Sequence, residues 1–230
     1  MLRSSIEISP SVMCMDFKYL ENDILTLEKA GADRFHFDIM DGYFVPNITL
    51  GPDIVKALRP LTKLPFEAHL MVEMPERFIE KFLEAEIITF HLEATRAPIR
   101  LSREIKGLNK KVSVAINPAT SVESLELLLP EIDEVLVMTV EPGFAGQKFI
   151  LQSIEKVRRL FNIIRDNRFS VRIEVDGAIS IETGRLLRDA GAEIFVGGTA
   201  GIFMKDGSPG ENLKKLKEAL SEGSSSLQYR

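Results

Sequence analysis

The sequence has little of the chemistry that stabilises a secreted protein or spans a membrane. Only one of its 230 residues is a cysteine, Cys14, which excludes an intramolecular disulfide and a zinc site built from several thiolates. No stretch reaches the roughly 18 to 20 continuous apolar residues of a membrane-spanning helix, and the first residues lack the apolar stretch of a secretory signal. We therefore expect a cytoplasmic protein without a membrane partner.

An excess of positive charge is also missing. The 34 acidic residues outnumber the 29 lysines and arginines, which gives a formal net charge of −5. No basic stripe with interleaved aromatic residues is present, so we expect no nucleic-acid partner. An anionic ligand would have to be held by local groups, which indicates a pocket for a small molecule.

Short apolar runs alternate with longer amphipathic stretches along the chain. Eight runs are predicted strands, at residues 6–9, 34–39, 66–71, 87–92, 112–116, 134–139, 172–175 and 193–196. Predicted helices between them include residues 19–30, 75–85, 122–129, 154–164 and 181–190. Eight regular units in so short a chain favour a single (β/α)8 TIM barrel, although the alternation also permits a doubly wound open sheet.

The chain is expected to form one domain. Hydrophobic residues make up 45% of it, enough for a full core, and no linker interrupts the pattern. Residues 1–222 are assigned to the barrel. Residues 223–230 have too little apolar content to anchor themselves, which predicts a disordered tail.

All three histidines of the chain fall inside predicted strands. His36 and Asp38 are two residues apart, so the alternation of a strand places both on one face. If that face is the barrel interior, His69 and Asp176 can converge with them from the ends of other strands. Two imidazoles and two carboxylates suit one divalent ion, and zinc, iron, manganese and cobalt are all chemically reasonable. The alternative is that the histidines are ordinary core residues satisfied by the backbone.

The third histidine, His91, forms with Glu93 a second His-x-acid pair on the fourth predicted strand. Because the other four residues already complete a cage, we predict a structural role for His91 in place of metal binding. Three methionines, Met40, Met71 and Met138, follow or end strands near the same mouth. They are either core filling or an apolar cap that excludes water from a reactive intermediate.

Glycine-containing segments follow the last three predicted strands, at residues 141–147, 176–178 and 197–201. Barrels often bind phosphate at this position through backbone N–H groups and a short helix N-terminus. One glycine loop would be an ordinary turn, but three in succession indicate a phosphate site, for which a basic side chain is not required.

These motifs resemble the ribulose-phosphate 3-epimerase family across nearly the whole chain. The matching segments are, in order, residues 9–11 (SPS), 36–47 (HFDIMDGYFVPN), 69–72 (HLMV), 138–144 (MTVEPGF) and 175–177 (VDG). The resemblance implies a barrel of the ribulose-phosphate-binding type and an isomerase that epimerises a ketose phosphate at C3. It also implies a homo-oligomer, as is common in that family, in the pentose phosphate pathway of carbohydrate metabolism.

The resemblance also implies roles for individual residues. His36, Asp38, His69 and Asp176 would hold one divalent ion, with zinc as the first candidate, and the two aspartates would be the catalytic acid/base pair. The implied contacts to a small-molecule sugar phosphate are Ser11, His69, Gly143, Phe144, Ala145, Gly146, Gly177, Ala178, Gly198 and Thr199.

Some positions depart from the commoner family pattern. Ala145 and Ala178 replace the usual glycine, and Thr199 replaces the usual serine. In these segments the chain is similar to the D-allulose-6-phosphate 3-epimerase branch, whereas residues 90–94 (FHLEA) are similar to the ribulose-phosphate enzymes. The substrate can therefore be D-ribulose 5-phosphate or D-allulose 6-phosphate.

Epimerisation next to a ketone removes a proton from one face of the carbon and delivers one to the other, which calls for two acid/base groups such as Asp38 and Asp176. A bound ion would stabilise the enediolate that forms between the two transfers. One rival is a lyase or decarboxylase with a lysine between carboxylates, but residues 38–41 (DIMD) contain none. The other rival is a non-catalytic sugar-phosphate binder.

Overall fold

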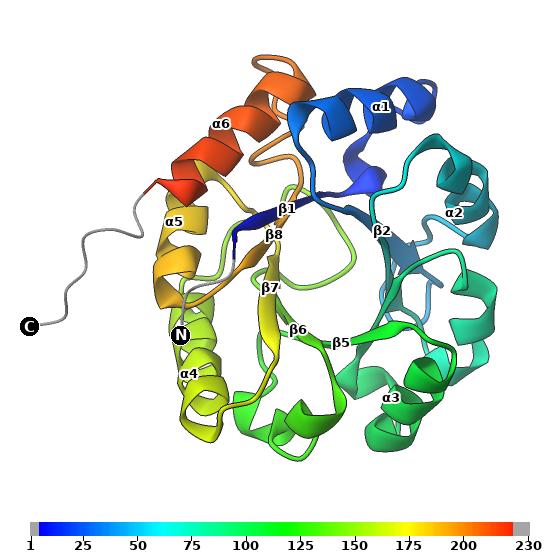
Figure 1. The fold of residues 1–230 in the computed structure, drawn as a ribbon, viewed down its shortest axis with the longest axis vertical. Coiled ribbons are helices and arrows are strands. Elements are labelled where there is room, and N and C mark those ends of the chain that lie inside the picture. Colours follow the sequence, from blue (N-terminus) through cyan, green and yellow to red (C-terminus); the bar gives the residue numbers. More distant parts are fainter. Residues whose placement is uncertain (1–4, 223–230) are drawn as a thin grey trace, which may run out of the picture.

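The described part of the chain, residues 5–222 of a computed structural model, is a parallel barrel (Figure 1). Its strands are β1 (Glu7–Pro10), β2 (Phe35–Met40), β3 (Phe66–Met71), β4 (Ile87–His91), β5 (Lys111–Ile116), β6 (Glu134–Met138), β7 (Arg172–Asp176) and β8 (Ile194–Gly197). They pair in the order β1-β8-β7-β6-β5-β4-β3-β2, and a parallel bridge between Ser11 and His36 joins the two ends. The predicted TIM barrel is confirmed, while the predicted tail at 223–230 lies outside the described residues.

Helices surround the strands as an outer ring (Figure 1). They are α1 (Leu20–Ala30), α2 (Pro52–Leu58), α3 (Pro98–Gly107), α4 (Gln152–Asn167), α5 (Ile181–Ala190) and α6 (Pro209–Ser221). Prolines begin α2, α3 and α6, where a missing N–H costs no helical hydrogen bond. Within the described residues, no helix is both long and apolar enough to cross a bilayer.

Two predicted α-helices are short 3-10 helices instead. Residues 75–85 form η3 (Pro75–Arg77) and η4 (Ile79–Phe82), and residues 122–129 form η6 (Val122–Leu125), with η7 (Leu129–Glu131) after it. Apolar spacings of three and four residues suit both helix types, so periodicity did not distinguish them.

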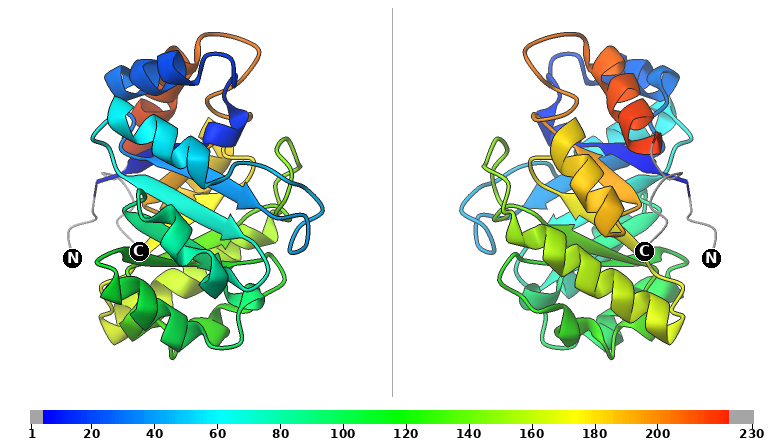
Figure 2. Two further views of the ribbon diagram at one scale, coloured as in Figure 1. Left: turned by 90° about the vertical axis from the view of Figure 1, so that its right-hand side faces the viewer. Right: turned by 90° about the vertical axis from the view of Figure 1, so that its left-hand side faces the viewer.

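The faces of β2 separate the packing core from the site. Phe35, Phe37 and Ile39 pack in the apolar core between strands and helices. His36 and Asp38, on the other face, are 0% and 3% exposed and point into the barrel. Because the strands are parallel, all their carboxyl ends lie at one mouth, where the loops after β2 and β6 project (Figure 2).

The barrel interior below this mouth is charged, which the sequence interpretation did not anticipate. Arg34, at the start of β2, donates to both carboxylate oxygens of Glu134 on β6, at 2.6 and 3.0 Å. These strands are not neighbours in the sheet, so the contact crosses the interior. Glu67 and Glu174 lie in the same layer and are fully buried. A layer of acidic residues around one arginine therefore supports the floor of the site.

Candidate active site

Four side chains predicted to bind a metal ion converge at the barrel mouth. One ligand atom from each of His36, Asp38, His69 and Asp176 lies within 4.8 Å of every other. His36 Nε2 is 3.1 Å from His69 Nδ1 and 3.3 Å from Asp38 Oδ1, and His69 Nδ1 is 3.4 Å from Asp38 Oδ1. Strands β2, β3 and β7 therefore bring together residues that are far apart in the sequence.

The spacing of these atoms fits a shared divalent ion. Nitrogen and oxygen ligands of zinc lie about 2.0 to 2.2 Å from the metal, which separates two tetrahedral ligands by about 3.4 Å. The three distances between His36, His69 and Asp38 are close to that value. A mixed set of imidazoles and carboxylates suits zinc and other divalent transition ions. The residues therefore fit the metal that the sequence motifs imply.

Hydrogen bonds fix both aspartates of the cage. The Ser11 hydroxyl donates to Asp38 Oδ2 at 2.6 Å, and the Thr49 hydroxyl donates to the Asp38 carbonyl. On the other side, the Thr139 N–H and hydroxyl donate to the Asp176 carbonyl at 2.7 and 2.9 Å. Sequence interpretation missed Thr49 and Thr139, although Thr139 lies inside the 138–144 motif.

The pKa values of the two carboxyl groups are shifted in opposite directions. Burial raises the pKa of Asp176 to about 7, and the nearby charge of Asp38 adds to this effect. Burial would also raise the pKa of Asp38, but His36 and His69 lower it below its usual range. In the metal-free protein at neutral pH, Asp38 is thus ionised and Asp176 is partly protonated, a difference typical of acid/base pairs.

The histidines also differ from one another. Burial opposes a charge on His36, yet Glu67 and Asp38 raise its pKa well above the usual value. Burial is the largest effect on His69 and lowers its pKa to about 4. Glu67, whose Oε2 lies 3.1 Å from His36 Nδ1, was missed, although the alternation of β3 places it on the face of His69.

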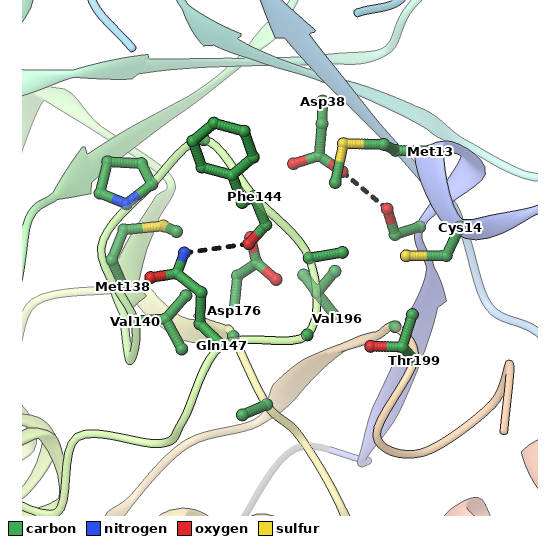
Figure 3. Close-up of a pocket in the computed structure, with 18 of the residues that line it drawn as sticks. Met13, Cys14, Asp38, Met138, Val140, Phe144, Gln147, Asp176, Val196 and Thr199 are labelled. Carbon is green, nitrogen blue, oxygen red and sulfur yellow. Dashed lines mark hydrogen bonds between the residues drawn. The ribbon is translucent and has the colours of Figure 1, made fainter. Parts of the chain in front are cut away.

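A pocket opens above the cage, and Asp38 and Asp176 point into it (Figure 3). The predicted residues that line it are Ser11, Asp38, Met40, Met71, Met138, Gly143, Phe144, Ala145, Gly146, Asp176, Gly177, Ala178, Gly198 and Thr199. His36 and His69 are fully buried and are not part of this lining. Glu141, Pro142 and Gln147, from the predicted glycine-containing segment 141–147, also line it. The lining further includes residues that were not predicted as contacts, namely Met13, Cys14, Val140 and Val196.

Glycine allows the backbone of the late loops to approach the pocket closely. Gly177 has φ +116°, and a Cβ there would lie 2.6 Å from Val140 Cγ2. After β8, the Gly198 carbonyl accepts from the N–H groups of Gly201, Ile202 and Phe203 at 3.3, 3.0 and 3.1 Å. This tight turn places Gly198 and the residue after it at the pocket wall.

The loop after β6 is held over the pocket by side-chain amides. Asn47, from the loop after β2, donates to the Gly143 carbonyl at 2.8 Å. Gln147 donates to the Phe144 carbonyl at 3.0 Å, and also to the Glu141 carbonyl. Phe144 is half exposed at this edge. Both amides belong to motifs read from the sequence, but their anchoring role depends on the folded loops.

Comparison with known proteins finds relatives along most of the chain. The profile of the Ribulose-phosphate 3 epimerase family matches residues 7–203. The chain is 46% identical over 217 residues to a ribulose-phosphate 3-epimerase of Methanocaldococcus jannaschii, covering 94% of this chain and 92% of that one. It is 44% identical over 222 residues to the enzyme of that name from Bacillus subtilis, covering 94% and 97%.

A solved structure shows the same fold at much lower identity. KGPDC from Streptococcus mutans superposes with a TM-score of 0.72 at 14% identity, covering 96% of this chain and 100% of that chain. Such identity shows the fold alone. The profile and the two close relatives establish more, and they confirm the epimerase predicted from the motifs: the chain belongs to the ribulose-phosphate 3-epimerase family.

Proposed function

We propose that this chain epimerises a ketose phosphate at C3 with Asp38 and Asp176 as the acid/base pair beside one divalent metal ion. The observation that carries the proposal is the convergence of four ligand atoms within 4.8 Å at the floor of a pocket. Family membership supports the reaction, because the close relatives are ribulose-phosphate 3-epimerases.

The two aspartates reach the pocket from different sides. Asp38 lies on β2 and Asp176 lies at the end of β7. Strands β1 and β8 lie between these two strands in the barrel. In the proposed reaction one carboxylate takes the C3 proton from one face of the substrate. The other carboxyl group, protonated at the start, delivers a proton to the opposite face, and the reverse reaction exchanges these roles.

His36, Asp38, His69 and Asp176 would hold the ion, which when bound supplies a positive charge that stabilises the enediolate. The histidines are buried beneath the aspartates, so they can bind the ion without blocking the pocket. The chemistry of the four residues suits zinc first, with iron, manganese and cobalt as the other candidates.

The phosphate would bind at the loops after β6, β7 and β8. Gly143, Gly146, Gly177 and Gly198 line the pocket beside Thr199. Backbone N–H groups in such glycine loops are suited to phosphate oxygens. Binding far from the reacting carbon would fix the orientation of the sugar, so the phosphate should contribute to turnover as well as to affinity.

One observation weighs against a lyase or decarboxylase that uses a lysine between carboxylates. In the described part of the chain, the residues lining the pocket include neither lysine nor arginine. The proposed site therefore has acid/base groups and ligands but no ammonium to stabilise charge. A non-catalytic sugar-phosphate binder would not need two carboxyl groups that reach the pocket from β2 and β7.

Cytoplasmic residence and homo-oligomer formation stay predictions.

The substrate proposal is tested by kcat/KM for D-ribulose 5-phosphate and D-allulose 6-phosphate, since that ratio defines specificity. We expect the five-carbon substrate to be preferred by about tenfold or more, as the names of the relatives suggest. Unphosphorylated D-ribulose is the matched control and should react poorly. A higher kcat/KM for the six-carbon phosphate would contradict the proposed substrate preference. No turnover of either phosphate would contradict the proposed function.

A further inference from the structure

His69 is in contact with a second buried histidine. Its Nδ1 faces the cage, while its Nε2 lies 2.9 Å from Nε2 of His91. The centroids of the two rings are 5.0 Å apart and their planes are 23° apart, so the rings meet nearly edge to edge, and both side chains are fully buried. His91 therefore touches a candidate metal ligand on the side away from the ion.

The other nitrogen of His91 faces an anchored carboxylate. His91 Nδ1 lies 3.4 Å from Glu93 Oε2. The remaining oxygen, Oε1, accepts from the Asn117 N–H at 2.9 Å and from the Thr120 hydroxyl. These contacts come from the loop after β5 and hold Glu93 at the end of β4. One of its oxygens is thus occupied by the loop, and the other is turned toward His91.

A chain of three groups has only one proton arrangement that leaves His69 ready to bind a metal. If Nδ1 of His69 is the ligand, its single ring proton is on Nε2, and Nε2 of His91 must accept it. His91 then carries its own proton on Nδ1, which makes no hydrogen bond within the described part of the chain but lies 3.4 Å from Glu93 Oε2, the carboxylate oxygen turned toward it. Reversing the chain would put a proton on His69 Nδ1, between the ring and the cage.

We propose that His91 and Glu93 are positioning residues that fix the tautomer and the ring orientation of His69 for the metal ion. This inference rests on the metal cage of the proposed function. Partners beyond the ligands commonly orient metal-binding histidines, and their loss typically weakens metal affinity 10- to 100-fold. Without His91, the Nε2–H of His69 would be a buried donor with no acceptor at that side.

The second histidine of the cage has a direct carboxylate partner instead. His36 Nδ1 lies 3.1 Å from Glu67 Oε2, and the Thr89 hydroxyl donates to Glu67 Oε1 at 2.6 Å. Both candidate histidine ligands thus end on a carboxylate that neighbouring residues anchor. The difference is the inserted ring of His91, which lies between His69 on β3 and Glu93, just after β4.

The test is a pair of substitutions that separates the hydrogen bond from the packing. H91F keeps an aromatic ring beside His69 but removes the acceptor, whereas H91Q removes the ring and keeps an oxygen that can accept from His69 Nε2. Zinc dissociation constants of the full chain are measured by competition with a chromogenic chelator. The unfolding midpoint of each metal-free variant is recorded alongside.

We expect H91F to weaken zinc binding by roughly 10- to 100-fold and H91Q to weaken it much less. Equal zinc affinity of H91F and the wild type would overturn the proposed positioning role of His91. A loss of affinity in H91Q as large as that in H91F would overturn it too. A wild type that binds no zinc would overturn the metal cage as well. This outcome distinguishes failure of the proposed function from failure of the positioning role alone.

A measurement on the wild type keeps the inference testable if H91F does not fold. The chain has three histidines, so nitrogen NMR of the zinc-loaded protein should show three separate rings. We expect His69 to carry its proton on Nε2 and His91 to carry its proton on Nδ1. A proton on Nε2 of His91 would contradict the proposed positioning of His69.

Discussion

The two sides of the barrel mouth use different parts of the chain. On the side of β2 to β4, the proposed chemistry depends on side chains, because all three histidines and Asp38 lie there. On the side of β6 to β8, the pocket wall comes mainly from the loops that follow these strands, and it includes Gly143, Gly146, Gly177 and Gly198. Asp176 is the exception, since it belongs to the cage but ends β7. Side-chain chemistry depends on residue identity, whereas backbone chemistry depends on the space that a missing Cβ leaves.

The largest effect is expected where the two sides meet. We expect D38N and D176N each to lower kcat by about 10²- to 10⁴-fold, because each removes one acid/base group. Epimerisation and deuterium entry from solvent at C3 are both measured, with metal content recorded to separate proton transfer from metal loss. S11A is the matched control, since it removes the hydrogen bond to Asp38 Oδ2 and keeps both carboxyl groups. Full activity in either Asn variant would refute the acid/base pair.

Two glycines of the backbone side should respond differently to the same change. In G177A the new Cβ would lie 2.6 Å from Val140 Cγ2 at a positive φ, so the free energy of unfolding should fall by about 1 to 3 kcal/mol. In G198A the Cβ would meet only Cys14 Sγ, at 3.6 Å. That variant should keep its stability and raise KM for the phosphate substrate by roughly tenfold.

Urea unfolding and steady-state kinetics check this pair together. We expect stability to change in G177A and KM to change in G198A. An unchanged KM in G198A would show that the wall at Gly198 does not contact the substrate.

The smallest effect concerns Lys156 on α4, whose ammonium donates to the Asn117 and Pro118 carbonyls after β5. Burial lowers the pKa of Lys156 to about 8, against the opposing charges of Glu93 and Glu141. Between that pH and the ordinary lysine pKa, the unfolded chain binds more protons than the folded one. The free energy of unfolding of the wild type, relative to that of K156Q, should therefore rise with pH above about 8. Urea unfolding at several pH values measures it, and a fall over this range would contradict the prediction.

Much of the site could be predicted because strand alternation is a strict rule. His36 and Asp38 share a face whatever the rest of the chain does, and the end of β7 places Asp176 at the same mouth. Glu67 was missed although the same rule applies to it, because an acidic residue in a strand usually indicates an exposed position.

Other features depend on contacts that no local pattern contains. Arg34 donates to Glu134 across the barrel, although the two residues are 100 positions apart in the sequence. The 3-10 helices at residues 75–82 have the apolar spacing of α-helices, and only the space between strands and neighbouring helices decides between them. The backbone role of Gly177 likewise depends on Val140, which approaches only in the folded barrel.

The measurement that tests the account most directly is an anomalous-difference map from crystals grown with zinc. We expect one peak at the mouth, about 2.0 to 2.2 Å from ligand atoms of His36, Asp38, His69 and Asp176. A peak bound by other residues, or no peak in protein that still epimerises its substrate after complete metal removal, would contradict it.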